Sequence, residues 1–279
     1  MRVHEQNATG TLACCLASVR QGVKRFVYVS SSEVYGTARR NPMGEDHPLS
    51  PTTVYGATKA GGELIARACM RTYGIPVSVV RLFNAYGPRA HATGDGAEVV
   101  TRFVRRILAD EAPVFFGDGR QSRDFTWVGD SAAGIVAAAE CDGLVGEEPV
   151  NIARGSGVSL RELSTLLLDA LDARHLSPEL REPRAGDVAH QWADTSRAQE
   201  LMGFAASTPL REGLERYAAW VVADAAVDRG GSLPLGSRRA GVPPTEQEVG
   251  MLADPVPSGR LDGGGVGQEQ ARPPLDRSG

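Results

Sequence analysis

Two short apolar segments on either side of a long helical pattern constrain the fold more than any other feature of the sequence. Residues 26–29 read Phe-Val-Tyr-Val and end in three serines, and residues 76–82 are again apolar and rich in β-branched side chains. Neither segment alternates polar with apolar residues, and a helix is expected between them over residues 54–73. Strands of this kind are buried on both faces, so the pattern predicts a parallel sheet that is covered by helices on each side.

Further helices and strands are expected around this unit. Ala8 to Gln21 has a helical pattern, with Gly22 at the position of a C-terminal cap. Ser159 and Glu162 have the spacing of a capping box. After Gly87-Pro88 the same reasoning predicts helices at residues 98–110, 131–140, 159–171, 195–202 and 210–226, and strands at 114–116 and 149–153. Helices and strands in this order are typical of an α/β protein.

The last 51 residues differ in composition from the rest of the chain. From Arg229 to Gly279 the sequence has 11 Gly, 7 Pro and no aromatic residue. Such a segment cannot bury enough apolar surface to offset the conformational entropy that ordering it would cost. We therefore expect a disordered tail over residues 227–279.

Charge and cysteine usage argue against several classes of protein. The net charge of -4 gives no basic surface for nucleic acid. No apolar run approaches the ~20 residues that span a bilayer, and the first residues are too polar for a secretion signal. The four cysteines, at positions 14, 15, 69 and 141, lack the spacing of a zinc site and suit a reducing compartment. The sequence therefore predicts a soluble cytoplasmic protein with no membrane, nucleic-acid or metal partner.

Tyr55 and Lys59 are four residues apart on the predicted helix, so both side chains emerge from one face. An ammonium beside a phenol favours the phenolate, and lowering the pKa of a tyrosine from about 10 to about 7 requires roughly 4 kcal/mol. The chain has only two lysines, Lys24 and Lys59, among 30 basic residues, which indicates that an ammonium is specifically required here. Ser31 closes the preceding strand at the edge where α/β sheets place their ligands. The three residues are candidates for general acid–base chemistry, although a turn serine could equally serve only the backbone.

A series of motifs surrounds these candidates in a constant order. They are Ser30-Ser31-Ser32-Glu33-Val34-Tyr35-Gly36, Tyr55-Gly56-Ala57-Thr58-Lys59, residues 81–88 (RLFNAYGP), residues 116–119 (FGDG), Arg123-Asp124-Phe125, Val150-Asn151-Ile152, residues 183–187 (PRAGD), Trp192-Ala193-Asp194 and Gly203-Phe204. Over roughly residues 4 to 222, the chain resembles the extended short-chain dehydrogenase/reductases that act on nucleotide sugars, the family of the UDP-glucose 4-epimerases and related dehydratases.

The resemblance implies a fold and a division of the chain. Residues 1–90 would form the C-terminal part of a Rossmann-like, doubly wound parallel sheet that binds NAD. Residues 91–226 would form a smaller α/β region that binds the nucleotide sugar and returns strands to the sheet. The resemblance also implies a homodimer paired through the helices of residues 8–21 and 54–73.

The resemblance also assigns roles to individual residues. Tyr55 would remove a proton from a sugar hydroxyl while NAD takes a hydride from the same carbon, with Ser31 as the third catalytic member. Lys59 would hold the nicotinamide ribose and lower the pKa of the phenol. Asn7 and Phe83 match positions on the cofactor side. The nucleotide-diphosphate sugar would be bound by Asn84, Arg123 and Arg184 at the diphosphate, by Asp187 at the nucleotide ribose and by Gln191 at the sugar pocket.

The reaction that the resemblance favours is 4-epimerisation through a transient 4-keto sugar, and Glu33 keeps two alternatives open. The family's 4,6-dehydratases carry Asp-Glu where this chain has Ser32-Glu33, so the acid is missing here. The UDP-glucuronate decarboxylases carry Ser-Glu and an arginine at the position of Arg123. Glu33 is thus a candidate catalytic residue, or else it only accepts hydrogen bonds from the backbone of its loop.

One motif of the family is absent from the sequence. The phosphate-binding loop, Gly-x-x-Gly-x-x-Gly after the first strand, does not occur in the region expected to be ordered. At about 30 residues for each strand–helix–strand unit, some 80–90 residues of the dinucleotide-binding half would precede Met1. Two hypotheses follow: an epimerase that begins upstream or is complemented by another chain, and a truncated homologue without catalysis that at most binds a nucleoside diphosphate. This chain alone is expected to bind NAD weakly or not at all, because that loop and the helix N-terminus behind it hold the cofactor pyrophosphate.

Overall fold

Three parallel strands form the sheet that carries the predicted catalytic residues. In the computed structural model, β1 (Phe26–Ser31) pairs with β2 (Val77–Leu82), and β2 pairs with β7 (Val150–Ile152). Ser31 lies opposite Leu82 at the ends of the first two strands. Because both pairings are parallel, the carboxyl ends of all three strands lie at one edge of the sheet. The predicted parallel sheet is confirmed.

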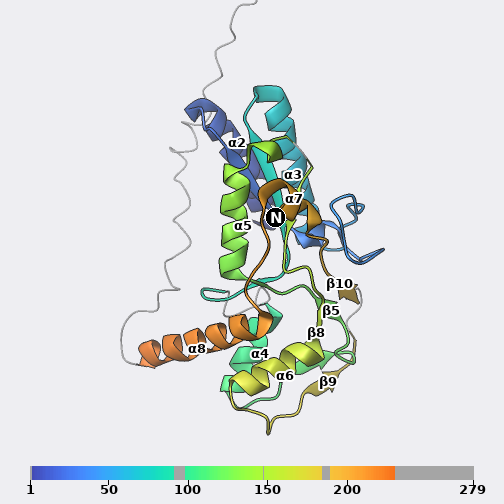
Figure 1. Ribbon diagram of the computed structural model, residues 1–279, viewed down its shortest axis with the longest axis vertical. Coiled ribbons are helices and arrows are strands. Elements are labelled where there is room, and N and C mark those ends of the chain that lie inside the picture. Colours follow the sequence, from blue (N-terminus) through green and yellow to red (C-terminus); the bar gives the residue numbers. More distant parts are fainter. Residues whose placement is uncertain (1, 91–97, 147, 184–188, 230–279) are drawn as a thin grey trace, which may run out of the picture. The chain divides into compact units, whose positions relative to one another are not determined.

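Helices cover both faces of this sheet, which is the doubly wound arrangement that the sequence predicted. They are α2 (Gly10–Gln21), α3 (Val54–Tyr73), α5 (Val128–Glu140) and α7 (Ser196–Met202), and Figure 1 shows them around the strands. Val79 belongs to the buried cluster that contains Cys15 of α2 and Ala66 of α3. Its neighbour Val80 belongs to the cluster that contains Ala138 of α5. Adjacent residues of β2 therefore pack against different helical layers, and this explains why the strand shows no polar alternation.

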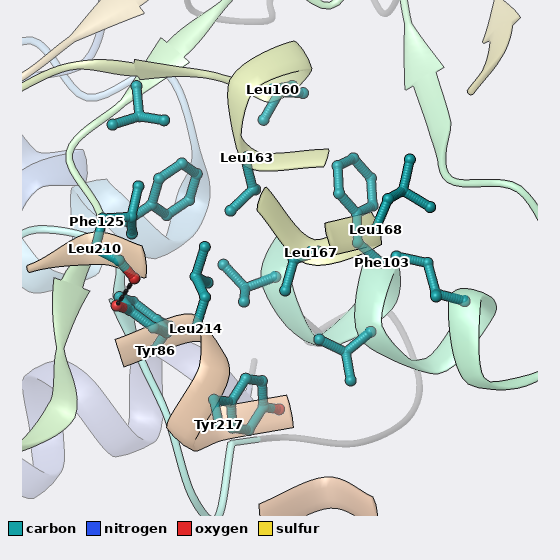
Figure 2. Close-up of a cluster of buried hydrophobic side chains, with 14 of the residues drawn as sticks. Tyr86, Phe103, Phe125, Leu160, Leu163, Leu167, Leu168, Leu210, Leu214 and Tyr217 are labelled. Atoms are coloured by element: carbon teal, nitrogen blue, oxygen red, sulfur yellow. Dashed lines mark hydrogen bonds between the residues drawn. The ribbon is translucent and has the colours of Figure 1, made fainter. Parts of the chain in front are cut away.

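A second group of elements packs around its own hydrophobic core. Its helices are α4 (Val99–Leu108), α6 (Leu160–Ala170) and α8 (Leu210–Arg229). Its strands are β3 (Ala85–Tyr86) with β6 (Thr126–Trp127), β4 (Val114–Phe116) with β9 (Glu179–Arg181), and β5 (Ser122–Arg123) with β8 (Val158–Ser159) and β10 (His190–Gln191). Figure 2 shows Phe103 of α4, Leu163 and Leu167 of α6, and Leu214 and Tyr217 of α8 in contact within this core.

The structure describes residues 2–90, 98–146, 148–183 and 189–229, with side chains to residue 224. The remaining elements are α1 (Arg2–His4), the π-helical turn η1 (Glu5–Thr9), and the 3₁₀ turns η2 (Ser32–Val34) and η3 (Asp142–Leu144). The first helical segment therefore begins before the predicted Ala8. α8 continues to Arg229, past the predicted start of the tail at residue 227, because the stretch after Trp220 is rich in alanine and favours a helix. The rest of the predicted tail lies outside the described residues.

Two of the predicted helix ends have the expected geometry. The Ser159 side chain accepts a hydrogen bond from the Glu162 N–H at the start of α6, and Gly22 adopts the left-handed conformation that ends α2. No helix in the described ranges combines the length and the apolar character that crossing a bilayer requires. The same ranges contain no group of three His, Cys, Asp or Glu side chains placed to bind a metal ion.

Gly61 and Gly62 are neighbours on α3 with opposite surroundings. A Cβ on Gly62 would lie 2.0 Å from the Tyr28 hydroxyl and 2.8 Å from the Asn7 carbonyl, whereas nothing lies within 4 Å of a Cβ on Gly61. We expect Gly61→Ala to raise the free energy of unfolding by up to about 1 kcal/mol, the difference in helix propensity. Gly62→Ala should lower it by about 1–3 kcal/mol, because α3 must move away from β1. Denaturant unfolding followed by circular dichroism measures both, and stabilisation by both variants would contradict this packing.

Candidate active site

The three predicted catalytic side chains meet at the carboxyl end of β1. Ser31 is the last residue of β1, and Tyr55 lies in the first turn of α3, where the Ser31 hydroxyl is close enough to lower the pKa of its phenol. Lys59 follows one helical turn later on the same face. Its ammonium lies 5.9 Å from the centroid of the Tyr55 ring and donates to the Val29 carbonyl at 3.0 Å. The structure therefore brings the three side chains together as one cluster.

The N-terminus of α3 is attached to the turn that follows β1. Thr53 caps the helix: its hydroxyl accepts a hydrogen bond from the Gly56 N–H at 3.0 Å and donates to Oε2 of Glu33 at 2.6 Å. Gly56 allows this close approach, because a Cβ there would lie 2.5 Å from the Glu33 carbonyl oxygen. The cap holds Tyr55 near both Ser31 and Glu33. Sequence reasoning did not single out Thr53, although its position before the predicted helix start is typical of an N-cap.

Burial has the largest influence on the phenol of Tyr55 and raises its pKa above the ordinary value. The hydrogen bond from Ser31 lowers the pKa, while the negative charges of Glu33 and Glu98 raise it. Burial also lowers the pKa of Lys59. Lys59 is not among the groups that shift the pKa of the phenol here, so its expected lowering of that pKa stays a prediction. The Lys59 ammonium donates to the Val29 carbonyl, and the Ser31 hydroxyl is the group that lowers the pKa of the phenol.

The two side chains predicted on the cofactor side lie in different environments. Asn7, in the π-helical turn η1, donates to Oγ1 of Thr58 at 3.0 Å, and Thr58 in turn donates to the Tyr55 carbonyl at 2.9 Å. Asn7 thus braces the first turn of α3. Phe83 is fully buried in a cluster with Tyr35 and other apolar residues. Its side chain fills the core at the end of β2, and the assignment of Phe83 to the cofactor side stays a prediction.

A cavity of about 410 Å³ opens beside the cluster, and Glu33 belongs to its lining. The charged and amide side chains that line it are Glu33, Asn84, Glu98, Arg102, Arg106, Gln121, Arg123 and Arg181. The lining thus contains four guanidinium groups and two carboxylates. Guanidinium groups bind phosphate oxygens in a bidentate geometry. Of the residues predicted to bind the diphosphate, Asn84 and Arg123 therefore share one cavity.

Three of the cavity's arginines were not anticipated from the sequence. Arg102 and Arg106 are one helical turn apart on α4, and Arg181 comes from β9. Arg106 pairs with Glu111, and Arg181 pairs with Glu179. The four-residue spacing on α4 was a visible signal, but only the tertiary structure shows that this helix face borders the same cavity as Arg123.

The remaining predicted residues lie beside this cavity or outside the described part of the chain. Gln191 lies next to Arg123 in the parallel pairing of β10 with β5, is 5 % exposed, and donates to the Ser32 carbonyl at 3.3 Å. This hydrogen bond supports the turn that contains Ser32 and Glu33. Arg184 and Asp187 lie outside the described residues.

Ser32 and Glu33 occupy the positions that separate the alternative reactions. Ser32 is 3 % exposed and does not line the cavity, whereas the Glu33 carboxylate does. Asn151, from the sequence motif at residues 150–152, is fully buried. It accepts a hydrogen bond from the hydroxyl of Tyr35, which directly follows this turn, at 2.7 Å. The turn therefore presents one carboxylate to the cavity.

Comparisons with known proteins identify the family. Residues 2–153 match the NAD dependent epimerase/dehydratase family, and the chain belongs to it. It is 33 % identical over 199 residues to an uncharacterised UDP-glucose epimerase of Bacillus subtilis, covering 71 % of this chain and 61 % of that protein. It is 36 % identical over 214 residues to a dTDP-glucose 4,6-dehydratase of Streptomyces griseus, covering 77 % of this chain and 63 % of that protein. The chain thus spans less than two thirds of the length of these relatives.

Solved structures confirm the Rossmann-like α/β fold. The UDP-glucose 4-epimerase of Thermotoga maritima, solved with UDP-glucose, superposes with a TM-score of 0.74 at 31 % identity, covering 79 % of this chain and 70 % of that chain. The dTDP-glucose 4,6-dehydratase DesIV of Streptomyces venezuelae, solved with NAD bound, gives a TM-score of 0.73 at 32 % identity, covering 80 % and 68 %. Both epimerases and dehydratases are thus among the similar proteins.

The titration of Tyr55 should respond in opposite directions to its two neighbours. Ser31→Ala removes a group that stabilises the phenolate, so the pKa of Tyr55 should rise. Glu33→Gln removes a nearby negative charge, so the pKa should fall. NMR of ¹³C-labelled tyrosine rings, assigned with Tyr55→Phe, measures both shifts. Ser32→Ala is the control, and a shift of the same sign in all three variants would contradict the described contacts.

Proposed function

We propose that this protein is an NAD-dependent nucleotide-sugar 4-epimerase of the UDP-glucose 4-epimerase type. The observation that carries the proposal is the cluster of Ser31, Tyr55 and Lys59 next to an arginine-rich cavity that contains Asn84 and Arg123. The cluster offers proton transfer at one end, and the cavity offers phosphate binding at the other. A reaction at the sugar of a nucleotide-diphosphate sugar requires both functions: one group that moves the hydroxyl proton and another that holds the diphosphate.

The residues of the cluster divide the chemistry between them. When Tyr55 is deprotonated and the sugar 4-hydroxyl lies against Ser31, the hydroxyl proton passes through the Ser31 hydroxyl to the Tyr55 phenolate, and the same path returns it in the second half of the reaction. NAD, when bound, would supply the hydride acceptor for C4 and the hydride donor for the resulting ketone. The arginines hold the diphosphate while the keto sugar turns, so that the opposite face receives the hydride.

Lys59 suits the ribose of the cofactor. An ammonium has three N–H donors, and the Val29 carbonyl accepts from one of them at 3.0 Å. The others can donate to ribose hydroxyls. Asn7 and the backbone of Phe83 are proposed to support the same end of the site, Asn7 by bracing Tyr55 through Thr58.

The two alternative reactions differ in how well the turn after β1 supports them. A 4,6-dehydratase needs an acid beside Glu33, and Ser32 supplies neither a carboxyl group nor an exposed side chain. A UDP-glucuronate decarboxylase would use a glutamate and an arginine, and Glu33 and Arg123 line the same cavity. The decarboxylase is therefore the second candidate. The remaining sequence-based substrate assignments, Arg184, Asp187 and Gln191, stay part of the proposal, with Gln191 acting through the Ser32 backbone.

Replacement of Tyr55 tests the proposed reaction. With NAD in excess, the chain should convert UDP-glucose to its C4 epimer, and Tyr55→Phe should lower kcat by about 100- to 10,000-fold, because phenylalanine has no oxygen to accept the proton. Tyr73→Phe, at the other end of the same helix and 50 % exposed, is the control. Nucleotide-sugar chromatography with UDP-glucose and UDP-glucuronate separates epimer from decarboxylated product. If UDP binds in calorimetry but no nucleotide sugar turns over, the chain is a non-catalytic nucleotide-diphosphate binder.

We also propose that two copies of the chain pair through α2 and α3, in the cytoplasm. Both helices expose apolar side chains: Leu12 of α2 is 40 % exposed and Leu64 of α3 is 63 % exposed, with the exposed Ala57 and Ala68 on the same side of α3 as Leu64. Apolar stripes of this kind are typical of helix–helix interfaces between subunits. The four cysteines are free thiols, which suits a reducing compartment.

Light scattering tests the pairing. The wild-type chain should have twice the mass of one 29.5 kDa chain, and Leu64→Lys should shift the mass toward one chain, because a buried ammonium would face the partner's apolar helix. Val136→Lys is the matched control, since Val136 is 54 % exposed on α5. A wild-type monomer, or a dimer that Val136→Lys dissociates and Leu64→Lys does not, would exclude this interface.

A further inference from the structure

Glu63 and Arg81 form a buried ion pair beneath the catalytic cluster. Their side chains are 2 % and 3 % exposed, and the pair is bidentate: Nη2 of Arg81 donates to Oε2 of Glu63 at 2.7 Å, and Nε donates to Oε1 at 2.9 Å. The pair joins α3 to β2, and neither residue lines the cavity or touches Tyr55 in the described contacts. Sequence reasoning assigned no role to either residue.

The carboxylate also reaches the strand that carries Ser31. The Ser30 hydroxyl donates to Oε1 of Glu63 at 2.5 Å, and Ser30 directly precedes Ser31 on β1. Glu63 lies one helical turn after Lys59 and two turns after Tyr55 on α3. One carboxylate is therefore bound to β1 next to Ser31, and it belongs to the helix that carries Tyr55 and Lys59.

The guanidinium extends the same connection to the turn that carries Glu33. Nη1 of Arg81 donates to the Tyr35 hydroxyl at 2.9 Å and to the Glu45 carbonyl at 3.3 Å, and the guanidinium lies 4.7 Å from the centroid of the Tyr35 ring. Tyr35 directly follows η2, which contains Glu33. Its hydroxyl donates to Oδ1 of Asn151 at 2.7 Å, next to the end of β7. All three segments that carry candidate catalytic residues are thus bonded to one ion pair.

Stability alone does not account for such a pair. Desolvating two charges offsets most of the attraction between them, and replacing a buried ion pair by apolar side chains of similar volume is often neutral for stability. A bidentate pair differs from an apolar contact in its directionality, because its hydrogen bonds are satisfied only in one relative placement of the groups. The hydrogen bonds of the pair therefore specify one position of α3 relative to β1 and β2.

We infer that Glu63 and Arg81 are positioning residues, which set the distance between Ser31 and the helix that carries Tyr55 and Lys59. The inference rests on the proposed function, since positioning matters only if these side chains act together. Misplacement of catalytic groups by about 1 Å can lower a rate by about 100-fold. The length of the Glu63 side chain, more than its charge, should therefore control the chemistry.

Two variants separate length from charge. Glu63→Asp keeps the charge and withdraws the carboxylate by about 1.5 Å, one carbon–carbon bond. Glu63→Gln keeps the length and removes the charge, leaving the Arg81 guanidinium buried without a counterion. Arg67→Gln is the matched control, because Arg67 lies one turn further along α3 in a bidentate pair with Glu148 whose side chains are 21 % and 63 % exposed.

The readouts are kcat, KM, denaturant stability and the NMR titration of Tyr55. Glu63→Asp should lower kcat by about 100-fold with KM unchanged and raise the pKa of Tyr55, since the bond from Ser31 lengthens. Glu63→Gln should lose more stability yet keep a higher kcat and a Tyr55 titration closer to wild type. Arg67→Gln should change neither kcat nor the titration.

Several outcomes would overturn the inference. If Glu63→Asp leaves kcat and the Tyr55 titration at their wild-type values, or if kcat in both variants only follows the fraction of folded protein, the pair is structural. Should Glu63→Asp fail to fold, Arg81→Lys answers the same question, because an ammonium cannot make the bidentate pair with Glu63 that the planar guanidinium makes. If the wild-type chain turns over no nucleotide sugar, the proposed function fails, and the Tyr55 titration alone still decides whether the pair positions the phenol.

Discussion

The parallel pairing of β1 with β2 is the interaction on which the rest of the arrangement depends. Parallel strands require a crossover, and α3 supplies it by running back along the sheet, so its first turn lies at the carboxyl end of β1. Tyr55 in that first turn and Ser31 at the strand end therefore meet at the same edge. Asn84 follows the end of β2 and reaches the same edge from the neighbouring strand.

Close packing then sets the distance between helix and strand. Gly56 and Gly62 let α3 approach within a distance that any Cβ would prevent, the first against the Glu33 carbonyl and the second against Tyr28. Thr53 ties the first turn to Glu33, and the Glu63–Arg81 pair ties the middle of the helix to both strands. Small residues permit the contact, and directional hydrogen bonds specify one placement within it.

The two ends of the site differ in their surroundings. At the cluster, partial burial raises the pKa of Tyr55, which is still 41 % exposed, and the Ser31 hydroxyl lowers it. At the cavity, the arginines face an open space in which phosphate oxygens can replace water. The similar epimerases and dehydratases share one fold. At the position where the resemblance gives the dehydratases an aspartate, this chain has Ser32, which is buried and carries no carboxyl group.

Sequence alone determined the local elements and whatever follows from their periodicity. The non-alternating apolar runs specified a parallel sheet, the helical spacing put Tyr55 and Lys59 on one face, and the ordered motifs identified the family. Tertiary structure alone decided the burial of Phe83, the gathering of Arg102 and Arg181 with Arg123, and the direction of the Tyr55 pKa. These properties depend on which groups from distant segments surround a side chain. Residue type and spacing along the chain do not predict those surroundings. The tertiary structure also decided the pairing of Glu63 with Arg81. Only folding brings the two side chains together and removes water from both, so that they bond to each other.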